Sequence, residues 1–372
     1  MIYLDSAATT FQKPLSVSYA MQRAMRTMSS PGRGGYAAAI AAEETAFRCR
    51  SLAAELFGVP SPEQVVFTSN ATHALNIAIR SLVPEGGRVA VSGYEHNAVT
   101  RPLHALGARI KVAASPLFDR AALLRAFENS ISPELDAVVC THVSNVFGFV
   151  LPIEEIAALC RAEGVPLIVD ASQSAGILPF ELDTLGAAFI AMPGHKGLYG
   201  PQGTGLLLCG AEPEPLLRGG TGSQSILQEM PEDLPDRLEA GTHNMPGIAG
   251  LLEGLRFVEQ QGVGRIAGHE RHLTRHMAAR LRDIPGAEVF YTPEDGAQTG
   301  VLSFRLDGWD CEALGEALAA QGAAVRAGLH CAPLAHRTAG TLETGTVRCS
   351  FSAFSTTAQV EHFARILRQI VR

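Results

Sequence analysis

The sequence has 372 residues, of which 47% are hydrophobic and 18% are charged, and its formal net charge is -7 at pH 7. This length allows a large core and two lobes. The charges form no long run of one sign, so neither a nucleic-acid groove nor a membrane-surface patch is indicated. No apolar stretch of about 18 residues occurs, and the first residues lack the layout of a signal peptide, which together predict a cytoplasmic protein.

The cysteines follow neither a disulfide pattern nor a zinc-site pattern. The seven cysteines are widely scattered and include no C-x-x-C pair. Neither structural disulfides nor a zinc cluster is therefore expected, and no metal site is predicted. Small-molecule chemistry is the default expectation for such a chain.

From about residue 65 to 210, short apolar runs alternate with amphipathic stretches, as in βαβ units. The expected strands are 65–68, 88–92, 109–113, 135–143, 166–170, 188–192 and 205–209, and the expected helices include 71–82, 119–128 and 153–163. Such alternation predicts an α/β fold with a mostly parallel seven-stranded sheet covered by helices on both faces. Ligands then bind at the carboxyl ends of the strands.

A segment rich in Gly, Pro and acidic residues, 212–246, separates this part from the rest. Beyond it, the pattern predicts helices at 247–261, 266–282, 311–321 and 357–371, with a strand at 299–306. We expect a large domain at 15–256 and a smaller α+β domain at 257–372. Residues 1–14 are expected to pack near the smaller domain.

Polar residues follow several of the expected strands. Ser69 to Thr72 begin a helix and could bind a phosphate there, although capping is the commoner use of such residues. His96 could stack on a planar cofactor or transfer a proton, and Asn145 could bind a cofactor or substrate. Asp170 could pair with a protonated pyridine nitrogen or merely cap a helix, and Gln173 lies within reach of the same ring.

Lys196 leaves the apolar run 187–192 in the turn Pro193-Gly194-His195-Lys196. Partial burial at the end of a strand lowers the pKa of a lysine amine and makes it a candidate Schiff-base nucleophile. A solvated loop lysine is the ordinary alternative when this residue is taken alone. The polar groups at neighbouring strand ends favour the functional interpretation, because all of them suit one phosphorylated aldehyde.

On these motifs the chain resembles a class V, fold-type I pyridoxal-phosphate enzyme, specifically the branch of cysteine desulfurases and selenocysteine lyases. The resemblance runs nearly end to end. It is carried by residues 3–10 (YLDSAATT), 67–72 (FTSNAT), 95–97 (EHN), 142–145 (HVSN), 170–173 (DASQ), 194–196 (GHK), 199–201 (YGP) and 239–242 (EAGT).

The resemblance implies roles for these residues. Lys196 would form the Schiff base with pyridoxal 5'-phosphate, Asp170 would pair with the ring nitrogen, Gln173 would meet the phenolic oxygen and His96 would stack on the ring. The phosphate would be held by Ala71, Thr72 and His195, and by Thr242 of a neighbouring subunit. A homodimer with shared active sites is thus implied.

The chain departs from the family pattern at Pro193, where relatives usually carry a phosphate-binding serine. Proline offers neither a hydroxyl nor an N-H group. Thr221 or Ser223 is the hypothetical replacement.

The reaction depends on the C-terminal segment 326–332, RAGLHCA, whose counterpart in relatives holds the cysteine that attacks the substrate's sulfur. Cys331 is accordingly the expected nucleophile, in an exposed loop flanked by His330 and Arg326, a setting that would favour a thiolate. Buried, inert thiols are expected instead for Cys140, Cys160 and Cys209. Arg348 corresponds to the residue that binds the substrate's α-carboxylate in relatives. Further substrate contacts are expected from Asn145, Arg326 and Arg33.

The resulting hypothesis is a cysteine desulfurase that converts L-cysteine to L-alanine with a persulfide on Cys331. A small sulfur-accepting scaffold protein is the expected partner. A class V aminotransferase remains open, as does a lyase for L-selenocysteine or another sulfur amino acid. A non-enzymatic cofactor-binding protein is disfavoured, because the residues needed for catalysis are all present.

Overall fold

The computed structural model describes residues 1–32 and 34–371. Its largest sheet has seven strands in the order β2-β8-β7-β6-β5-β3-β4, and all neighbours pair in parallel except β8, which is antiparallel to both β7 and β2. The mostly parallel seven-stranded sheet predicted from the sequence is therefore confirmed. The strands are β2 (Val65–Thr68), β3 (Arg88–Ser92), β4 (Arg109–Ala113), β5 (Ala137–Thr141), β6 (Leu167–Asp170), β7 (Phe189–Pro193) and β8 (Gly205–Cys209).

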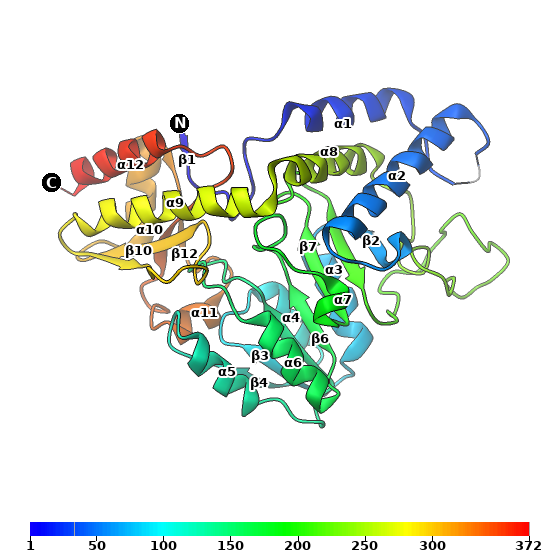
Figure 1. Ribbon diagram of the computed structural model, residues 1–372, viewed down its shortest axis with the longest axis horizontal. Coiled ribbons are helices and arrows are strands. Elements are labelled where there is room, and N and C mark those ends of the chain that lie inside the picture. Colours follow the sequence, from blue (N-terminus) through cyan, green and yellow to red (C-terminus); the bar gives the residue numbers. More distant parts are fainter. Residues whose placement is uncertain (33, 372) are drawn as a thin grey trace.

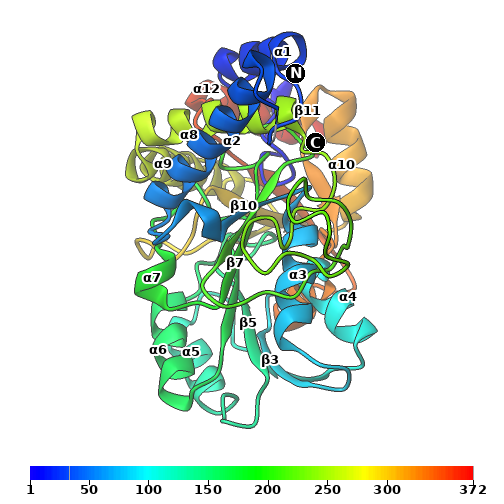
Figure 2. The same cartoon turned by 90° about the vertical axis from the view of Figure 1, so that its right-hand side faces the viewer.

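The central strands consist of apolar residues because helices cover both of their faces. Val138 and Cys140 of β5 belong to one buried cluster, whereas Val139 belongs to the cluster on the opposite face. Figure 2 shows α5, α6 and α7 on one side of the sheet and α3 and α4 on the other. These helices are α3 (Ala71–Leu82), α4 (Asn97–Ala105), α5 (Arg120–Glu128), α6 (Ile153–Glu163) and α7 (Leu182–Leu185).

The expected strand 135–143 is shorter than predicted at both ends. The Asp136 backbone N-H bonds the carbonyl of Arg88, the first residue of the neighbouring strand β3, and the His142 carbonyl accepts a bond from the Leu151 N-H. The apolar run thus continues beyond the strand into loops that bury it at the sheet edge.

A second, four-stranded antiparallel sheet has the order β12-β13-β10-β9. The N-terminal strand β1 pairs in parallel with β11, so residues 2–3 lie in the C-terminal part of the molecule, beside a strand that is distant in sequence (Figure 1). The elements are β1 (Ile2–Tyr3), β9 (Ala287–Phe290), β10 (Val301–Leu306), β11 (Ala323–Ala324), β12 (Arg326–Gly328), β13 (Thr346–Ser350), α9 (Val263–Arg282), α10 (Cys311–Ala320), α11 (Pro333–Thr338) and α12 (Thr357–Ile370).

The helices α1 (Leu15–Thr27), α2 (Ala37–Leu56) and α8 (Met245–Gln261) pack beside the large sheet, with α1 lying along α8 (Figure 1). A single 3-10 turn, η1 (Pro62–Gln64), precedes β2. The stretch between β8 and α8 contains turns and bends but no helix or strand. Among the described residues, no helix combines the length and apolar character needed to cross a membrane.

Candidate active site

Lys196 lies in the tight connection between β7 and β8. The Gly194 N-H bonds the Thr204 carbonyl at 2.8 Å, and the Gly200 N-H bonds the Gly194 carbonyl at 2.7 Å. A Cβ on Gly197 would lie 2.3 Å from the Ala175 carbonyl oxygen, so the backbone around Lys196 fits its neighbours only with glycine at this position. The amine is therefore held at the carboxyl end of β7 by a rigid turn.

The surroundings of Lys196 favour a neutral amine. Burial lowers the pKa of Lys196 to about 8; the Asp170 carboxylate opposes this shift, and the Arg348 guanidinium adds to it. An ordinary lysine has a pKa near 10.4, so a far larger fraction of this amine is unprotonated at neutral pH. The nucleophile expected from the sequence thus has the electrostatic setting that it needs.

One cavity at this edge of the sheet gathers most of the predicted cofactor residues. Its lining includes Ala71, Thr72, His96, Asn145, Asp170, Pro193, Gln173, His195 and Lys196. These residues come from five separate connections after strands of the large sheet. The parallel sheet brings them together because its strand ends meet at one edge.

Asp170 ends β6 and is only 2% exposed. Its Oδ1 accepts a bond from the Ser172 N-H at 2.9 Å. Within residues 1–32 and 34–371, no cationic side chain lies within ion-pair distance of this carboxylate. A buried carboxylate that lacks a cationic partner is suited to bind a cationic ligand.

Two histidines face the cavity in neutral form. The Nδ1 of His96 accepts the Ala98 N-H at the start of α4, and burial lowers the pKa of His96, with Asp170 opposing. The Nδ1 of His195 lies 3.0 Å from the Thr9 hydroxyl, and burial lowers the pKa of His195 to about 4. Both rings can therefore accept or donate a hydrogen bond without carrying a charge at neutral pH.

Ala71 and Thr72 form the first turn of α3, and both line the cavity. Asn70 caps the helix by accepting the His73 N-H at 2.9 Å. The capping interaction considered for this segment is therefore present, and it leaves the N-H groups of the first two helical residues unpaired within the helix. Such a helix start favours an anion.

Pro193 lines the same cavity, where it contributes neither a hydroxyl nor an N-H. Thr221 and Ser223, the hypothetical replacements for the missing serine, do not line this cavity in their own chain. Both line a different cavity, next to Arg50 and Glu239, and the Ser223 hydroxyl donates to Asp236. The Lys13 amine, which bonds the His195 carbonyl oxygen, is a charged group beside the site that the sequence did not reveal.

Cys331 is exposed, whereas the other six cysteines are buried, including Cys140, Cys160 and Cys209 as expected. Both His330 and Cys331 have positive φ angles, 49° and 54°, which are rare for such residues. The Asn145 amide holds the loop by donating to the His330 carbonyl at 2.9 Å, and the Asn97 N-H donates to the Cys331 carbonyl at 2.8 Å. The thiol is thus carried by a loop bonded directly to the rim of the cavity.

The expectation that His330 and Arg326 flank the thiol in an exposed loop is only partly right. His330 is buried, its Nε2 lies 3.1 Å from the Thr346 hydroxyl, and burial holds its pKa well below the ordinary value. It therefore provides no positive charge at neutral pH. Arg326 is half exposed, but its guanidinium is bound to Asp5.

Arg348 lies on β13 and is almost fully buried. Its Nη1 donates to the Asn145 carbonyl at 2.8 Å, and its Nη2 donates to Asp5 at 2.9 Å. Asp5 is a site residue that the sequence did not single out, although it lies inside the motif 3–10 as an acid that directly follows a short apolar run. Arg33, the remaining predicted substrate residue, lies outside the described residues.

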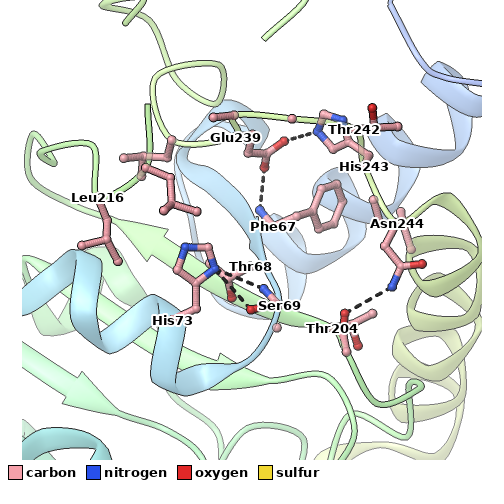
Figure 3. Close-up of a pocket in the computed structure, with 17 residues that line it drawn as sticks. Phe67, Thr68, Ser69, His73, Thr204, Leu216, Glu239, Thr242, His243 and Asn244 are labelled. Atoms are coloured by element: carbon pink, nitrogen blue, oxygen red, sulfur yellow. Dashed lines mark hydrogen bonds and ion pairs between the residues drawn. The ribbon is translucent and has the colours of Figure 1, made fainter. Parts of the chain in front are cut away.

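Thr242 does not join the Lys196 cavity of its own chain. It lines a separate cavity with Phe67, His73 and Glu239. Figure 3 shows Thr242 beside His243, with Glu239 bonded to His243 and to the Phe67 N-H. The Glu239 carboxylate also pairs with the buried Arg50 of α2, which anchors the segment around Thr242 to that helix.

Comparisons with known proteins agree with this geometry. The model of the aminotransferase class-V family matches residues 2–363. A probable cysteine desulfurase from Methanothermobacter thermautotrophicus is 32% identical, covering 99% of this chain and 94% of the relative. Probable cysteine desulfurases from Mycolicibacterium paratuberculosis and Mycobacterium leprae are 35% and 36% identical over the whole chain, which spans only 55% and 62% of their lengths.

Solved structures match equally well. A cysteine desulfurase from Thermococcus onnurineus superimposes with a TM-score of 0.90 at 29% identity, covering all of this chain and 94% of that one. The cysteine desulfurase CsdA from Escherichia coli gives 0.86 at 26% identity with the same coverage. The family match, the full-length relatives and the shared fold lead to one conclusion: the chain belongs to the aminotransferase class-V family.

Proposed function

We propose that this protein is a pyridoxal-phosphate-dependent cysteine desulfurase that converts L-cysteine to L-alanine and receives the sulfur on Cys331. The observation that carries the proposal is the bonding of the Cys331 loop to the rim of the Lys196 cavity, through Asn145 and Asn97. An aminotransferase needs the cavity but has no use for an exposed thiol fixed beside it. The curated relatives named as cysteine desulfurases support the same choice.

The cavity suits the cofactor on three counts. The start of α3 favours a phosphate, with Ala71, Thr72 and His195 around it. The buried Asp170 would pair with the ring nitrogen, and Gln173 would approach the phenolic oxygen once its present bond to the Ala7 carbonyl adjusts. When bound, the cofactor supplies the electron sink that makes the α proton of an amino acid acidic.

The chain's own groups then perform the remaining steps. The Arg348 guanidinium binds the substrate carboxylate, and the neutral Lys196 amine takes the α proton. The Cys331 thiolate attacks the substrate's sulfur, so an S-S bond forms as the C-S bond breaks. The electron pair of that bond stays on carbon, which is protonated to the methyl group of alanine.

The decisive experiment is anaerobic incubation with L-cysteine, followed by intact-mass and peptide analysis. One added sulfur atom on Cys331 and an equal amount of alanine are expected. Cys331→Ser should abolish both while the cofactor remains bound, and Cys311→Ser, at a buried thiol, is the matched control. Alanine formation at the wild-type rate by Cys331→Ser would refute the assignment, and amino exchange with a keto acid would favour the aminotransferase.

The position of Thr242 supports a homodimer in which each site is completed by the partner's Thr242. The helices α1 and α2 also carry exposed apolar side chains, among them Leu15, Tyr19 and Phe47, which a partner would cover. Mixing inactive Lys196→Ala with inactive Thr242→Ala should restore activity, because a mixed dimer contains one intact site. The absence of complementation in mixed dimers would refute shared sites.

The exposure of Cys331 suits delivery of the sulfur to an external acceptor, for which we propose a small sulfur-carrier scaffold protein. L-Selenocysteine is the alternative substrate, since its side chain differs from that of cysteine by one atom. Parallel assays of alanine release from the two amino acids measure the preference directly.

A further inference from the structure

The N-terminal segment contacts the ring of His195 through Thr9. The Nδ1 of His195 lies 3.0 Å from the Thr9 hydroxyl. His195 lines the Lys196 cavity, whereas Thr9 is not among the residues that line it. Because Nδ1 is engaged with Thr9, Nε2 is the ring nitrogen that remains for a ligand in the cavity.

The tautomer of His195 decides whether this ring can hold a phosphate. Burial lowers the pKa of His195 to about 4, and the Lys196 and Lys13 amines add to the shift, so the ring is neutral near pH 7 and carries one hydrogen. With the hydrogen on Nε2, the ring donates to a phosphate oxygen; with the hydrogen on Nδ1, Nε2 presents a lone pair to the anion. The choice matters in this chain because Pro193 supplies neither a hydroxyl nor an N-H to the same cavity.

The Thr9 hydroxyl has one hydrogen and two possible acceptors, both belonging to His195. Its oxygen lies 3.0 Å from Nδ1 and 3.2 Å from the His195 carbonyl oxygen. If the hydroxyl donates to the carbonyl, the ring hydrogen has to sit on Nδ1 and point to Thr9. If the hydroxyl donates to Nδ1, the ring hydrogen stays on Nε2, because the hydrogen bond at one ring nitrogen sets the state of the other.

Other donors already occupy the His195 carbonyl. It accepts the Thr10 N-H at 3.1 Å, the Thr10 hydroxyl at 3.0 Å and the Lys13 amine at 3.3 Å. The Lys13 amine also donates to the Thr10 hydroxyl at 2.8 Å, which leaves the hydrogen of that hydroxyl for the carbonyl. A carbonyl oxygen has two lone pairs, and these donors use both of them without Thr9. The Thr9 hydroxyl is therefore free to donate to Nδ1, the nearer of its two acceptors.

We propose that Thr9 is a positioning residue for the cofactor: its hydroxyl donates to Nδ1 of His195 and keeps the ring hydrogen on Nε2, from which it is donated to the phosphate of pyridoxal 5'-phosphate. The inference rests on the proposed function, because it takes this phosphate as the ligand of His195. Thr9 acts only through the ring. A residue from the N-terminal segment, far along the chain from the turn 193–196, thus sets how that turn binds an anion.

The first test measures the tautomer in the apoprotein, without cofactor or substrate. The histidine rings are labelled with ¹⁵N, and the signals of His195 among the 12 histidines are assigned by their loss in His195→Ala. The wild-type protein and Thr9→Ser should show the hydrogen on Nε2 and none on Nδ1. In Thr9→Val a measurable share of the hydrogen should move to Nδ1. A hydrogen on Nδ1 in the wild-type protein, or an unchanged tautomer in Thr9→Val, would overturn the proposal.

The second test compares the dissociation constants of pyridoxal 5'-phosphate and of pyridoxal, which lacks the phosphate. Thr9→Val should weaken the phosphorylated aldehyde by about fivefold, the equivalent of one neutral hydrogen bond, and leave pyridoxal unchanged. Thr9→Ser keeps the hydroxyl and should bind both aldehydes as the wild-type protein does. Thr10→Val is the matched control, because Thr10 bonds the same carbonyl but not the ring, so both aldehydes should change by the same factor.

A double-mutant cycle shows whether Thr9 acts through the ring. In His195→Ala, the further change Thr9→Val should leave the affinity for pyridoxal 5'-phosphate unaltered, because the group that Thr9 positions is gone. Additive losses, or binding by Thr9→Val that is unchanged or tighter, would overturn the proposal; tighter binding is the result expected if Thr9 donates to the carbonyl instead.

The proposal stays testable if Thr9→Val does not fold, because the ring spectrum of the wild-type protein decides the tautomer alone. Failure of the desulfurase assignment is a separate outcome. Wild-type protein would then yield no alanine from cysteine, while the ring spectrum and the two aldehyde affinities would remain measurable.

Discussion

The pKa of Lys196 can be tested through the rate at which the apoenzyme captures pyridoxal 5'-phosphate. Only the neutral amine attacks the aldehyde. With a pKa of about 8, the neutral fraction rises from about 9% at pH 7 to about 90% at pH 9, a tenfold increase that levels off above pH 9. An ordinary lysine, with a pKa near 10.4, would show an increase of about a hundredfold over the same range and no plateau.

The assay is stopped-flow recording of the visible band that forms on capture, between pH 6.5 and 10. Asp170→Asn removes the charge that holds the pKa of Lys196 up, so its midpoint should move below pH 8. Burial raises the pKa of Glu95 to about 8 as well, and Glu95→Gln is the control that separates the two groups. A rate that still climbs above pH 9.5 without a plateau would refute the reasoning.

Three further predictions concern stability and cofactor capture. Arg50→Met should lower the free energy of unfolding by about 3 kcal/mol or more, because it leaves the buried Glu239 carboxylate without its guanidinium partner. Arg48→Met, at an exposed ion pair, should change this free energy by less than about 1 kcal/mol. Chemical denaturation measures both variants, and equal effects would contradict the argument. Gly197→Ala should impair cofactor capture, measured by cofactor absorbance, because the new Cβ would lie 2.3 Å from the Ala175 carbonyl oxygen; full cofactor occupancy in this variant would disprove the steric argument. Gly264→Ala in α9, where a Cβ meets nothing, is the control and should stabilise the protein by about 0.5–1 kcal/mol in thermal unfolding. Burial lowers the pKa of His142 to about 3, whereas the same side chain in the unfolded chain takes up a proton near pH 6.5, so the free energy of unfolding should fall by about 2 kcal/mol from this group between pH 6.5 and 5. His142→Gln should flatten the dependence of this free energy on pH, and an unchanged dependence would refute the role of His142.

The large sheet could be predicted because its strands are short apolar runs separated by amphipathic helices. The ends of β2, β3, β4 and β8 agree with the sequence pattern to the residue. The ends of strand β5 differ from the predicted range 135–143, because an apolar run indicates that residues are buried and not that they pair in a strand. The buried residues 142–143 lie in a loop. The helices α1 and α2 were not predicted, since α2 has small residues on several faces and no single apolar stripe.

The cavity was predictable where a residue type alone dictates its chemistry. Lys196 and Asp170 stand at strand ends, and a parallel sheet makes such positions meet. Asp5 was not predictable in the same way, because its partners Arg326 and Arg348 lie more than three hundred residues away along the chain. The neutral state of His330 was also hidden, since only the fold shows that its ring points to Thr346.

The antiparallel return of β8 beside β7 limits how Lys196 can move. The bonds of Gly194 to Thr204 and to Gly200 close the connection on both sides of the lysine, so its backbone cannot swing during a turnover. All travel of the amine between one reacting atom and the next must come from rotations within its flexible four-carbon stem. The reach of the Lys196 amine is therefore set by the length of this stem, measured from a fixed backbone.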